Sequence, residues 1–438
     1  MQDLNMQVSN FIKKFSYDHL PQQIQRQVKL CVLDLLGAVL GGSQTKVAQI
    51  AREFARVFWP ENEATIIMGG AKSNCIGATF ANAFQANAID IDDGFRLVKG
   101  HPGALVIPAA LAVAEAKGRT GKELLEAIIV GYEVGTRAGI IWHDHYPLYH
   151  ASGAWGSVAT AAVTAKLLNL DVSQIYNALG IAEYQAPINP MMRCIDYPAM
   201  VKDGIGWGAQ AGVTSALMAL HGFTGVPSLF GLEKYRDIVK TLGAKYNILQ
   251  LYFKPYACCR WAQPAIAGAL KIMQESSLQV EQIKSIDVYT FKESARLWCK
   301  PPRTTEEAQY NISYPIAAAV HDGEVGPKQV LDDKLSNKKI LELLTKIRII
   351  ADERFDKSFP QIAQSEVCIA DTTGRLFWSG VQQAKGDFDN PLTEAEIHEK
   401  FYWLAGQVKP SDHLKDLVNI VYDLENIKDL TRLYSLLN

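Results

Sequence analysis

The chain has 438 residues, of which 48% are hydrophobic and 21% are charged, and its net charge at pH 7 is −2. This length exceeds the usual range of a single domain, so we expect two domains with a sizeable core. The balanced charge lacks the basic excess typical of proteins that bind nucleic acid or anionic membranes. Any anionic ligand must therefore be bound by local basic side chains.

The cysteine content and the N-terminus indicate a reduced, cytoplasmic setting. Seven cysteines, an odd number, do not resemble a disulfide framework in a chain of this length, and the first residues lack the pattern of a signal peptide. The most apolar windows, such as residues 151–170, are interrupted by Lys166 and are rich in Ala, Gly and Ser. They predict packed helices rather than membrane spans.

The N-terminal part of the chain predicts helices. Residues 1–20 carry apolar side chains at helical spacing, and Pro21 opens a second helix, which a Gly-Gly pair ends. A third helix is predicted over residues 47–59. Residues 64–70 are the only early stretch that could form a short strand.

From residue 73 to residue 222 the pattern stays helical, with Gly, Ala and Ser recurring between the large apolar residues. Small residues let helix backbones approach closely, so this stretch predicts a compact multi-helix core. Residues 120–142 form its most regular amphipathic member.

After about residue 235 the pattern changes to that of an α+β segment. Residues 283–291 alternate apolar and polar side chains, and residues 347–350 are rich in isoleucine. Two further strands, residues 366–370 and 375–381, flank a turn and predict a hairpin. Helices return at the end of the chain, where residues 393–437 begin with a capping box and could pack back on the helical part.

The densest polar group lies in residues 90–103, between the small-residue run 78–88 and the apolar run 104–114. It contains three carboxylates, two basic side chains and His101. Glycine and proline make this stretch a loop, and loops fixed by buried flanks are where catalytic side chains usually lie. The alternative is that its acids only cap the next helix.

Further candidate residues lie at or just before the predicted N-termini of helices. They are Tyr149 and His150, Lys202, the block from Lys254 to Arg260, and Tyr314. Helix N-termini favour anions through their free N–H groups and their dipole, so several converging ends would make a carboxylate site. The alternative for each histidine is a structural role with satisfied hydrogen bonds.

Several cofactor classes are disfavoured by the spacing of the residues. Cys258 and Cys259 are adjacent and therefore lack metal-ligand spacing, and His143 with His145 is a weak metal signal. The glycines of residues 204–208 depart from the dinucleotide fingerprint and follow no strand. Neither a nucleophile elbow nor a P-loop is present. We expect no metal site.

The candidate residues, taken together, resemble the MmgE/PrpD family, which includes 2-methylcitrate dehydratase, cis-aconitate decarboxylase and iminodisuccinate epimerase. The segments that carry the resemblance are Asp90-x-Asp92-Asp93 with His101-Pro102-Gly103, Tyr149-His150-x-Ser152, Lys202, Lys254-Pro255-Tyr256-x-Cys258-Cys259-Arg260, and residues 302–308. They follow in the family's order and cover nearly the whole chain.

The resemblance implies a mainly α fold with a large all-helical domain and a smaller α+β lid domain inserted into it. We place the helical domain at residues 1–240 and 393–438, and the lid at residues 241–392. The resemblance also implies a homodimer that needs no metal and no organic cofactor. The site is expected in the cleft between the two domains.

The expected site residues fall into two groups. Catalytic residues implied by the resemblance are Asp90, His101, His150, Lys202 and Tyr314, and expected substrate-binding residues are Lys254, Tyr149, Asp93 and Arg260. Asp90 is expected to orient or charge a histidine, while Asp92 and Asp93 cap the loop or position Lys99.

The chemistry shared by the family is proton transfer at a carbon next to a carboxylate. Such a carbon is a very weak acid, so positive charge must hold the carboxylate while a base stands nearby. Lys202 and Lys254 suit the first task. His101 and His150, whose ordinary pKa is about 6.5, suit proton transfer near neutral pH, and Tyr314 could supply a proton from another side.

The sequence also departs from parts of the family. Dehydratase and decarboxylase types usually have Thr after the paired aspartates, where this chain has Gly94, and dehydratases share His-Pro-Ser-Asp-Asn, where this chain has His101-Pro102-Gly103. These departures disfavour 2-methylcitrate as substrate, and the longer loop is closer in form to the epimerase type.

We therefore expect a cofactor-independent enzyme acting on a small di- or tricarboxylate, most simply a lyase, either a dehydratase or a decarboxylase. An epimerase of an iminodisuccinate-like dicarboxylate is the first alternative. A non-catalytic carboxylate-binding protein with the family fold is the second.

Overall fold

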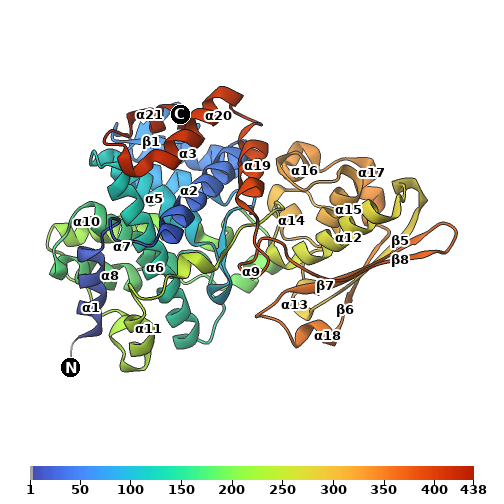
Figure 1. Ribbon diagram of the computed structural model, residues 1–438, viewed down its shortest axis with the longest axis horizontal. Coiled ribbons are helices and arrows are strands. Elements are labelled where there is room, and N and C mark those ends of the chain that lie inside the picture. Colours follow the sequence, from blue (N-terminus) through green and yellow to red (C-terminus); the bar gives the residue numbers. More distant parts are fainter. Residues whose placement is uncertain (1–2) are drawn as a thin grey trace.

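The computed structural model describes residues 3–438 and consists of a helical body joined to a smaller part that carries a sheet (Figure 1). The helices of the body are α1 (Leu4–Lys14), α2 (Gln22–Gly42), α3 (Lys46–Phe58), α4 (Cys75–Ala86), α5 (Pro102–Ala116), α6 (Gly121–His145), α7 (Ser152–Leu167), α8 (Val172–Tyr184), α9 (Met191–Asp196), α10 (Ile205–Leu220) and α11 (Arg236–Lys240). This order confirms the predicted helical N-terminal half.

The helices of the body begin and end where local chemistry stops them. Thr120 and Glu123 form a capping box at the start of α6, each side chain accepting from the other's backbone N–H. The helices α5 and α7 are buried nearly all round. Glycine and alanine on α7 allow α6 and α10 to pack closely against it.

The smaller part contains a four-stranded sheet in the order β6-β5-β7-β8. Its strands are β5 (Ile283–Thr290), β6 (Ile347–Ala351), β7 (Gln364–Asp371) and β8 (Leu376–Gln383). The strands β5 and β6 are parallel, whereas β7 pairs antiparallel with β5 and with β8 as the predicted hairpin. The helix α12 (Gln263–Ser276) packs on β7 and β8.

The smaller part contains further helices, some packed on the sheet and others on neighbouring helices. They are α13 (Lys292–Ala295), α14 (Thr305–Gln309), α15 (Ser313–Asp322), α16 (Pro327–Val330), α17 (Lys338–Leu344) and α18 (Glu353–Asp356). The predicted fold class, mainly α with a smaller α+β part, is confirmed.

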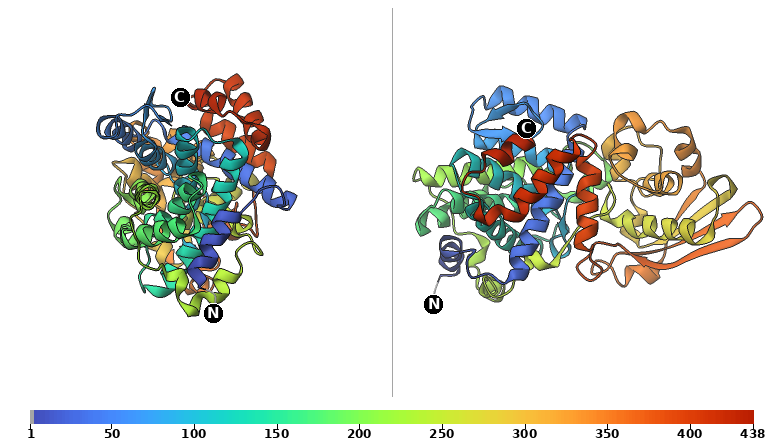
Figure 2. Two further views of the ribbon diagram at one scale, coloured as in Figure 1. Left: turned by 90° about the vertical axis from the view of Figure 1, so that its left-hand side faces the viewer. Right: turned by 45° about the horizontal axis from the view of Figure 1, so that its top comes forward.

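The C-terminal helices return to the body, as the sequence predicted. They are α19 (Glu394–Ala405), α20 (Ser411–Asp423) and α21 (Thr431–Leu437), and α19 packs on α2. Figure 2 shows that α19 runs along the junction between the body and the sheet-bearing part. Thr393 and Glu396 form the predicted capping box.

Two short pairings tie distant segments together. One joins β1 (Ala64–Ile66) to β2 (Ala71–Ser73). This confirms a strand within residues 64–70, but the expectation that no other early stretch forms a strand is wrong, because its partner β2 lies just beyond that range. The other joins β3 (Gly94–Phe95) to β4 (Leu251–Tyr252). Because β3 lies in the polar loop 90–103 and β4 ends just before Lys254, this second pairing brings two predicted site segments together.

The buried side chains form two main cores. One spans the body and the C-terminal helices, and the other lies mostly in residues 257–369. Ile89 and Ile91 belong to the second core although they precede the lid in sequence. The domain boundaries at residues 240 and 393 remain a prediction.

No single helix within residues 3–438 is long and apolar enough to cross a membrane. The helices α2 and α3, bent by 94° at their junction, reach that length and composition only as a pair. The seven cysteines are all unpaired.

Candidate active site

The polar loop is fixed by buried residues on both sides of Asp90. Ile89 and Ile91 are fully buried, and Asp90 itself adopts a left-handed backbone with φ of 55°. Such a conformation is strained for a residue other than glycine and is kept only where the surroundings hold it. The loop ends at His101, the residue before α5, whose backbone N–H donates to Ser152 Oγ at 3.0 Å.

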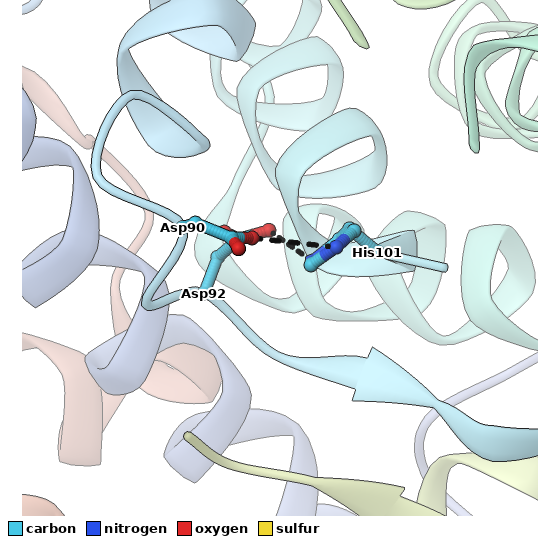
Figure 3. Close-up of side chains that lie close together, drawn as sticks. All are labelled: Asp90, Asp92 and His101. Carbon is cyan, nitrogen blue, oxygen red and sulfur yellow. Dashed lines mark ion pairs between the residues drawn. The ribbon is translucent and has the colours of Figure 1, made fainter. Parts of the chain in front are cut away.

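The loop brings two carboxylates onto one imidazole (Figure 3). His101 Nδ1 lies 3.0 Å from Asp92 Oδ2, and His101 Nε2 lies 3.5 Å from Asp90 Oδ1. Lys254 Nζ donates to the same Asp90 oxygen at 2.7 Å. All four side chains are buried, so these charges interact with little screening by water.

The pKa shifts in this group favour its charged forms. Burial alone lowers the pKa of His101, but the carboxylates of Asp92 and Asp203 overcome it and raise that pKa above the ordinary value. Burial alone raises the pKa of Asp92, but His101 and Lys254 hold it well below its usual range. Asp90 and Asp92 likewise overcome burial and raise the pKa of Lys254.

Asp90, Asp92 and His101 also place one potential metal ligand each within 4.8 Å of one another. Their ligand types suit a divalent cation. However, the Lys254 ammonium already donates to Asp90 at 2.7 Å, so a metal bound by this carboxylate would lie beside a buried positive charge. The arrangement therefore fits an acid–base group better than a metal centre.

A small cavity of about 60 Å³, partly open to solvent, lies beside this group. It is lined by both parts of the chain, namely Asp90, Arg96, Lys99, His101, Tyr149, Met191, Ile195, Asp203, Tyr252, Cys259, Arg260, Trp261, Tyr310, Phe359, Pro360 and Ala363. Three cationic side chains and three tyrosine hydroxyls can thus meet a ligand's polar groups.

Two arginines of the cavity wall share one carboxylate. Arg260 forms an ion pair with the buried Asp387, and Arg96 Nη1 lies 3.7 Å from the same Asp387 oxygen. Arg96 also lies 3.4 Å from Asp389. Because the planar guanidinium group can bind a carboxylate through two N–H donors, both arginines could also hold an acidic ligand.

A second polar cluster faces the cavity from the start of α10. Tyr310 donates through its hydroxyl to Asp203 Oδ2 at 2.6 Å, and Ser152 Oγ lies 3.4 Å from Asp203 Oδ1. Lys202 Nζ donates to Gln309 Oε1 at 2.5 Å. Lys202 is buried and does not line the cavity itself.

Sequence reasoning missed Asp203 and Tyr310 as site residues. Both lie close to a predicted site residue, since Asp203 directly follows Lys202 and Tyr310 stands four positions before Tyr314. Neither has a spacing pattern that distinguishes it from a surface residue. They meet only in the fold, where the Tyr310 hydroxyl, just after α14, donates to Asp203, just before α10.

His150 lies outside this group. Its ring packs near Trp142, His143 and Tyr146, with centroid distances of 5.3 Å, 5.8 Å and 6.0 Å. It is buried, both ring nitrogens lack a hydrogen-bond partner among the described residues, and it does not line the cavity. Burial lowers the pKa of His150, which favours the neutral imidazole.

Tyr314, Tyr149 and Asp93 also have defined places. Tyr314 is fully buried in α15 and donates to the Gln329 carbonyl at 2.7 Å, away from the cavity lining. Tyr149 does line the cavity, and its hydroxyl donates to the Lys99 carbonyl at 2.7 Å. Asp93 points into the helical core instead.

The partners of Asp93 explain one departure from the family. The Tyr132 hydroxyl donates to Asp93 Oδ2 at 2.5 Å, and the Gly103 N–H donates to Asp93 Oδ1 at 2.9 Å. A Cβ added at Gly103 would lie 2.6 Å from the Asp93 carboxylate and from the Tyr132 hydroxyl. Glycine is therefore required here. Burial raises the pKa of Asp93 to about 7.

Gly94 is required for a similar reason. A Cβ at this position would lie 2.1 Å from the Tyr252 ring carbon that bears the hydroxyl, because β3 pairs Gly94 with Tyr252. Tyr252 in turn lines the cavity and lies beneath Arg260, whose guanidinium carbon is 4.7 Å from the ring centre. The glycine thus makes room for a residue of the cavity wall.

These features define a mainly α protein with a charged cavity between a helical body and an α+β lid. The chain belongs to the MmgE/PrpD family, because the MmgE/PrpD N-terminal domain matches residues 6–236 and the MmgE/PrpD C-terminal domain matches residues 256–426. The family expected from the sequence is confirmed.

Characterised relatives cover nearly the whole chain. A cis-aconitate decarboxylase-like protein of Aspergillus oryzae is 24% identical, over 100% of this chain and 97% of the relative. Cis-aconitate decarboxylase of Aspergillus terreus is 24% identical, over 99% and 95%. Cis-aconitate decarboxylase of Homo sapiens is 26% identical, over 96% and 91%. A decarboxylase is a lyase, which supports the enzyme class predicted from the sequence.

Proposed function

We propose that this protein is a cofactor-independent lyase that decarboxylates a small tricarboxylate of the cis-aconitate type. The observation that carries the proposal is a His101 imidazole held between Asp90 and Asp92 beside a cavity whose wall contains Arg96 and Arg260. This combination suits an anionic substrate that must accept a proton at carbon. The names of the relatives support the choice of substrate class.

In the proposed reaction the arginines, with Lys99, bind carboxylates that remain on the substrate. The bond between a carbon and the departing carboxylate breaks, carbon dioxide leaves, and the electron pair passes into the adjoining unsaturated carboxylate system. The His101 imidazolium then donates its proton to carbon. Positive charge near the carboxylates stabilises the transient negative charge, and Asp92 keeps the imidazole protonated until the transfer.

The other predicted residues act around this proton transfer. Lys254 holds Asp90 and compensates its charge, so Asp90 orients His101. Lys202 acts through Gln309, and Tyr149 contributes its hydroxyl to the cavity wall. Tyr314 and Asp93 support the framework, since their hydrogen bonds lie inside the helical packing.

An epimerase of an iminodisuccinate-like dicarboxylate is the second candidate, and one observation favours it. The surroundings raise the pKa of His101 and lower that of His150, which suits the first to act as an acid and the second as a base. Inversion of a stereocentre needs two such groups on opposite faces of the carbon, whereas decarboxylation needs only the proton donor. His150 would have to approach the cavity for this reaction.

Proton NMR of the purified protein in D₂O, with cis-aconitate, citrate, 2-methylcitrate, iminodisuccinate and tartrate-like diacids, tests these alternatives. We expect loss of carbon dioxide from cis-aconitate and a five-carbon unsaturated diacid that carries deuterium. Deuterium exchange in an unchanged skeleton would favour the epimerase. New vinyl signals without carbon dioxide would favour a dehydratase, and no change with any acid would favour the non-catalytic protein.

We also propose that the protein forms a homodimer through the exposed apolar side chains around α9. Tyr184, Ile188, Tyr197, Val201 and Trp207 are large apolar residues that are each at least 49% exposed. Light scattering after size-exclusion chromatography should give about twice the monomer mass, and Tyr197→Glu with Ile188→Glu should shift it to the monomer.

A further inference from the structure

A buried lysine from the C-terminal tail holds the backbone of the polar loop. Lys400 lies in α19, and its Nζ donates to the Ile91 carbonyl at 2.7 Å and to Asp34 Oδ1 at 2.5 Å. Ile91 is the residue between Asp90 and Asp92. Lys400 is 6% exposed and does not line the cavity, so it cannot contact a ligand there.

The charge of Lys400 has a buried counterion. Asp34, from α2, is 1% exposed, and its second oxygen has no hydrogen-bond partner among the described residues. Burial raises the pKa of Asp34, and the nearby ammonium opposes that rise. Burying two charges costs desolvation free energy. In return, the charged Lys400 donor holds the Ile91 carbonyl by a stronger hydrogen bond than a neutral donor would make.

The hydrogen bond from Lys400 fixes the backbone at Ile91, and the positions of Asp90 and Asp92 relative to His101 depend on that backbone. Asp90 and Asp92 approach the two nitrogens of one imidazole from the same short loop, so a rotation at Ile91 would move both carboxylates. Asp90 already holds a left-handed backbone that needs support. Lys400 supplies that support from a helix at the junction between the body and the lid (Figure 2).

We propose that Lys400 is a positioning residue, which holds the Ile91 carbonyl so that Asp90 and Asp92 face His101 in the geometry needed for proton transfer. This inference rests on the proposed function, because it concerns the same acid–base group. Asp34 serves to keep the Lys400 ammonium in place. Lys400 therefore affects the rate of the chemical step, whereas the residues of the cavity wall bind the substrate.

Four variants test the proposal: Lys400→Met, Lys400→Arg, Asp34→Asn and the double variant Asp34→Asn with Lys400→Met. The double variant removes one positive and one negative charge, so it keeps the net charge and leaves no unpaired buried carboxylate. We expect kcat to fall about 30- to 100-fold in the double variant, with KM within threefold of the wild type, since a misplacement of about 1 Å costs rate in this range.

The conservative variants should separate positioning from folding. Lys400→Arg keeps a charged donor and should recover kcat to within about tenfold, and Asp34→Asn keeps Lys400 with a neutral acceptor, so its loss of kcat should be smaller than that of the double variant. Unfolding temperatures measured alongside show which variants are folded. A folded double variant with wild-type kcat would overturn the proposal, as would equal losses in Asp34→Asn and in the double variant.

Titration of the His101 ring by NMR provides a readout that does not need turnover. With the loop released, His101 loses close contact with Asp92, so its pKa should fall in the double variant compared with the wild type. An unchanged His101 pKa would refute the positioning role even if no substrate is turned over. A lowered pKa in a protein that is inactive with every acid would instead refute the proposed function alone.

Discussion

His101 and His150 occupy equivalent places in the chain but very different surroundings. Each stands just before a buried helix, α5 and α7 respectively, and each is buried. Carboxylates raise the pKa of His101, whereas burial lowers that of His150. The comparison teaches that a helix start places a histidine, while the side chains packed around its ring decide whether the ring is protonated.

Replacing each histidine in turn tests this comparison most strongly. We expect His101→Gln to lower kcat for decarboxylation by about a thousandfold or more, because the proton donor is lost. His150→Gln should cost no more than about tenfold, since the ring does not line the cavity. Steady-state kinetics with both folded variants measures the difference. Equal losses would indicate that His150 reaches the substrate and would support the epimerase.

Removing the carboxylate of Asp92 should lower the pKa of His101, as burial does for His150. A proton donor is active only when protonated, so wild-type kcat/KM should fall as pH rises through the raised pKa of His101, above the ordinary value of about 6.5. In Asp92→Asn the imidazolium loses its nearest anion, and this fall should move to lower pH by about one unit or more. An unchanged pH profile would contradict the role of Asp92.

The arginines of the cavity wall, Arg96 and Arg260, should affect substrate binding more than proton transfer. Arg96→Met or Arg260→Met should raise KM by about tenfold and change kcat by less than threefold, because each removes one guanidinium that we propose binds a substrate carboxylate. Arg348→Met is the matched control, since Arg348 is an exposed lid residue paired with Asp287. A larger effect on kcat than on KM would place these arginines in the proton-transfer step instead.

The prediction for Asp93 concerns stability and not catalysis. Its pKa is raised from 3.8 to about 7 in the folded protein, so the folded state favours the protonated form. This contribution is fully present below about pH 4 and is lost as pH rises through 7, by at most about 4 kcal/mol. In Asp93→Asn, denaturant titrations should show a weaker loss of stability between pH 4 and 7; an unchanged loss would exclude Asp93 as its source.

Most of the fold could be predicted from local patterns. The capping box at Thr393, the alternation in β5 and the small-residue helices are all visible in short windows of sequence, and the structure contains each of them. The loop 90–103 was predicted for the same reason, because its glycines and proline break the helical pattern. Local rules also predicted that the tail would return to the body.

The part of the site that could not be predicted from the sequence depends on contacts between residues distant in the chain. Lys254 meets Asp90 across 164 positions, and Tyr310 meets Asp203 across 107. Asp92 was expected to cap the loop or position Lys99, but it pairs with His101 once the loop closes. Without the fold, a residue such as Asp203 resembles any other aspartate.

Gly94 and Gly103, the two positions that distinguish this loop from the dehydratase pattern, are each dictated by a neighbouring side chain. Tyr252 occupies the space of one missing Cβ, and Asp93 with Tyr132 occupies the space of the other. A loop transplanted from a dehydratase would therefore collide with this framework unless those three residues were exchanged with it. The unit that can be moved between members of the family comprises the loop, Tyr132 of α6 and Tyr252 of β4, which are separated by more than a hundred positions.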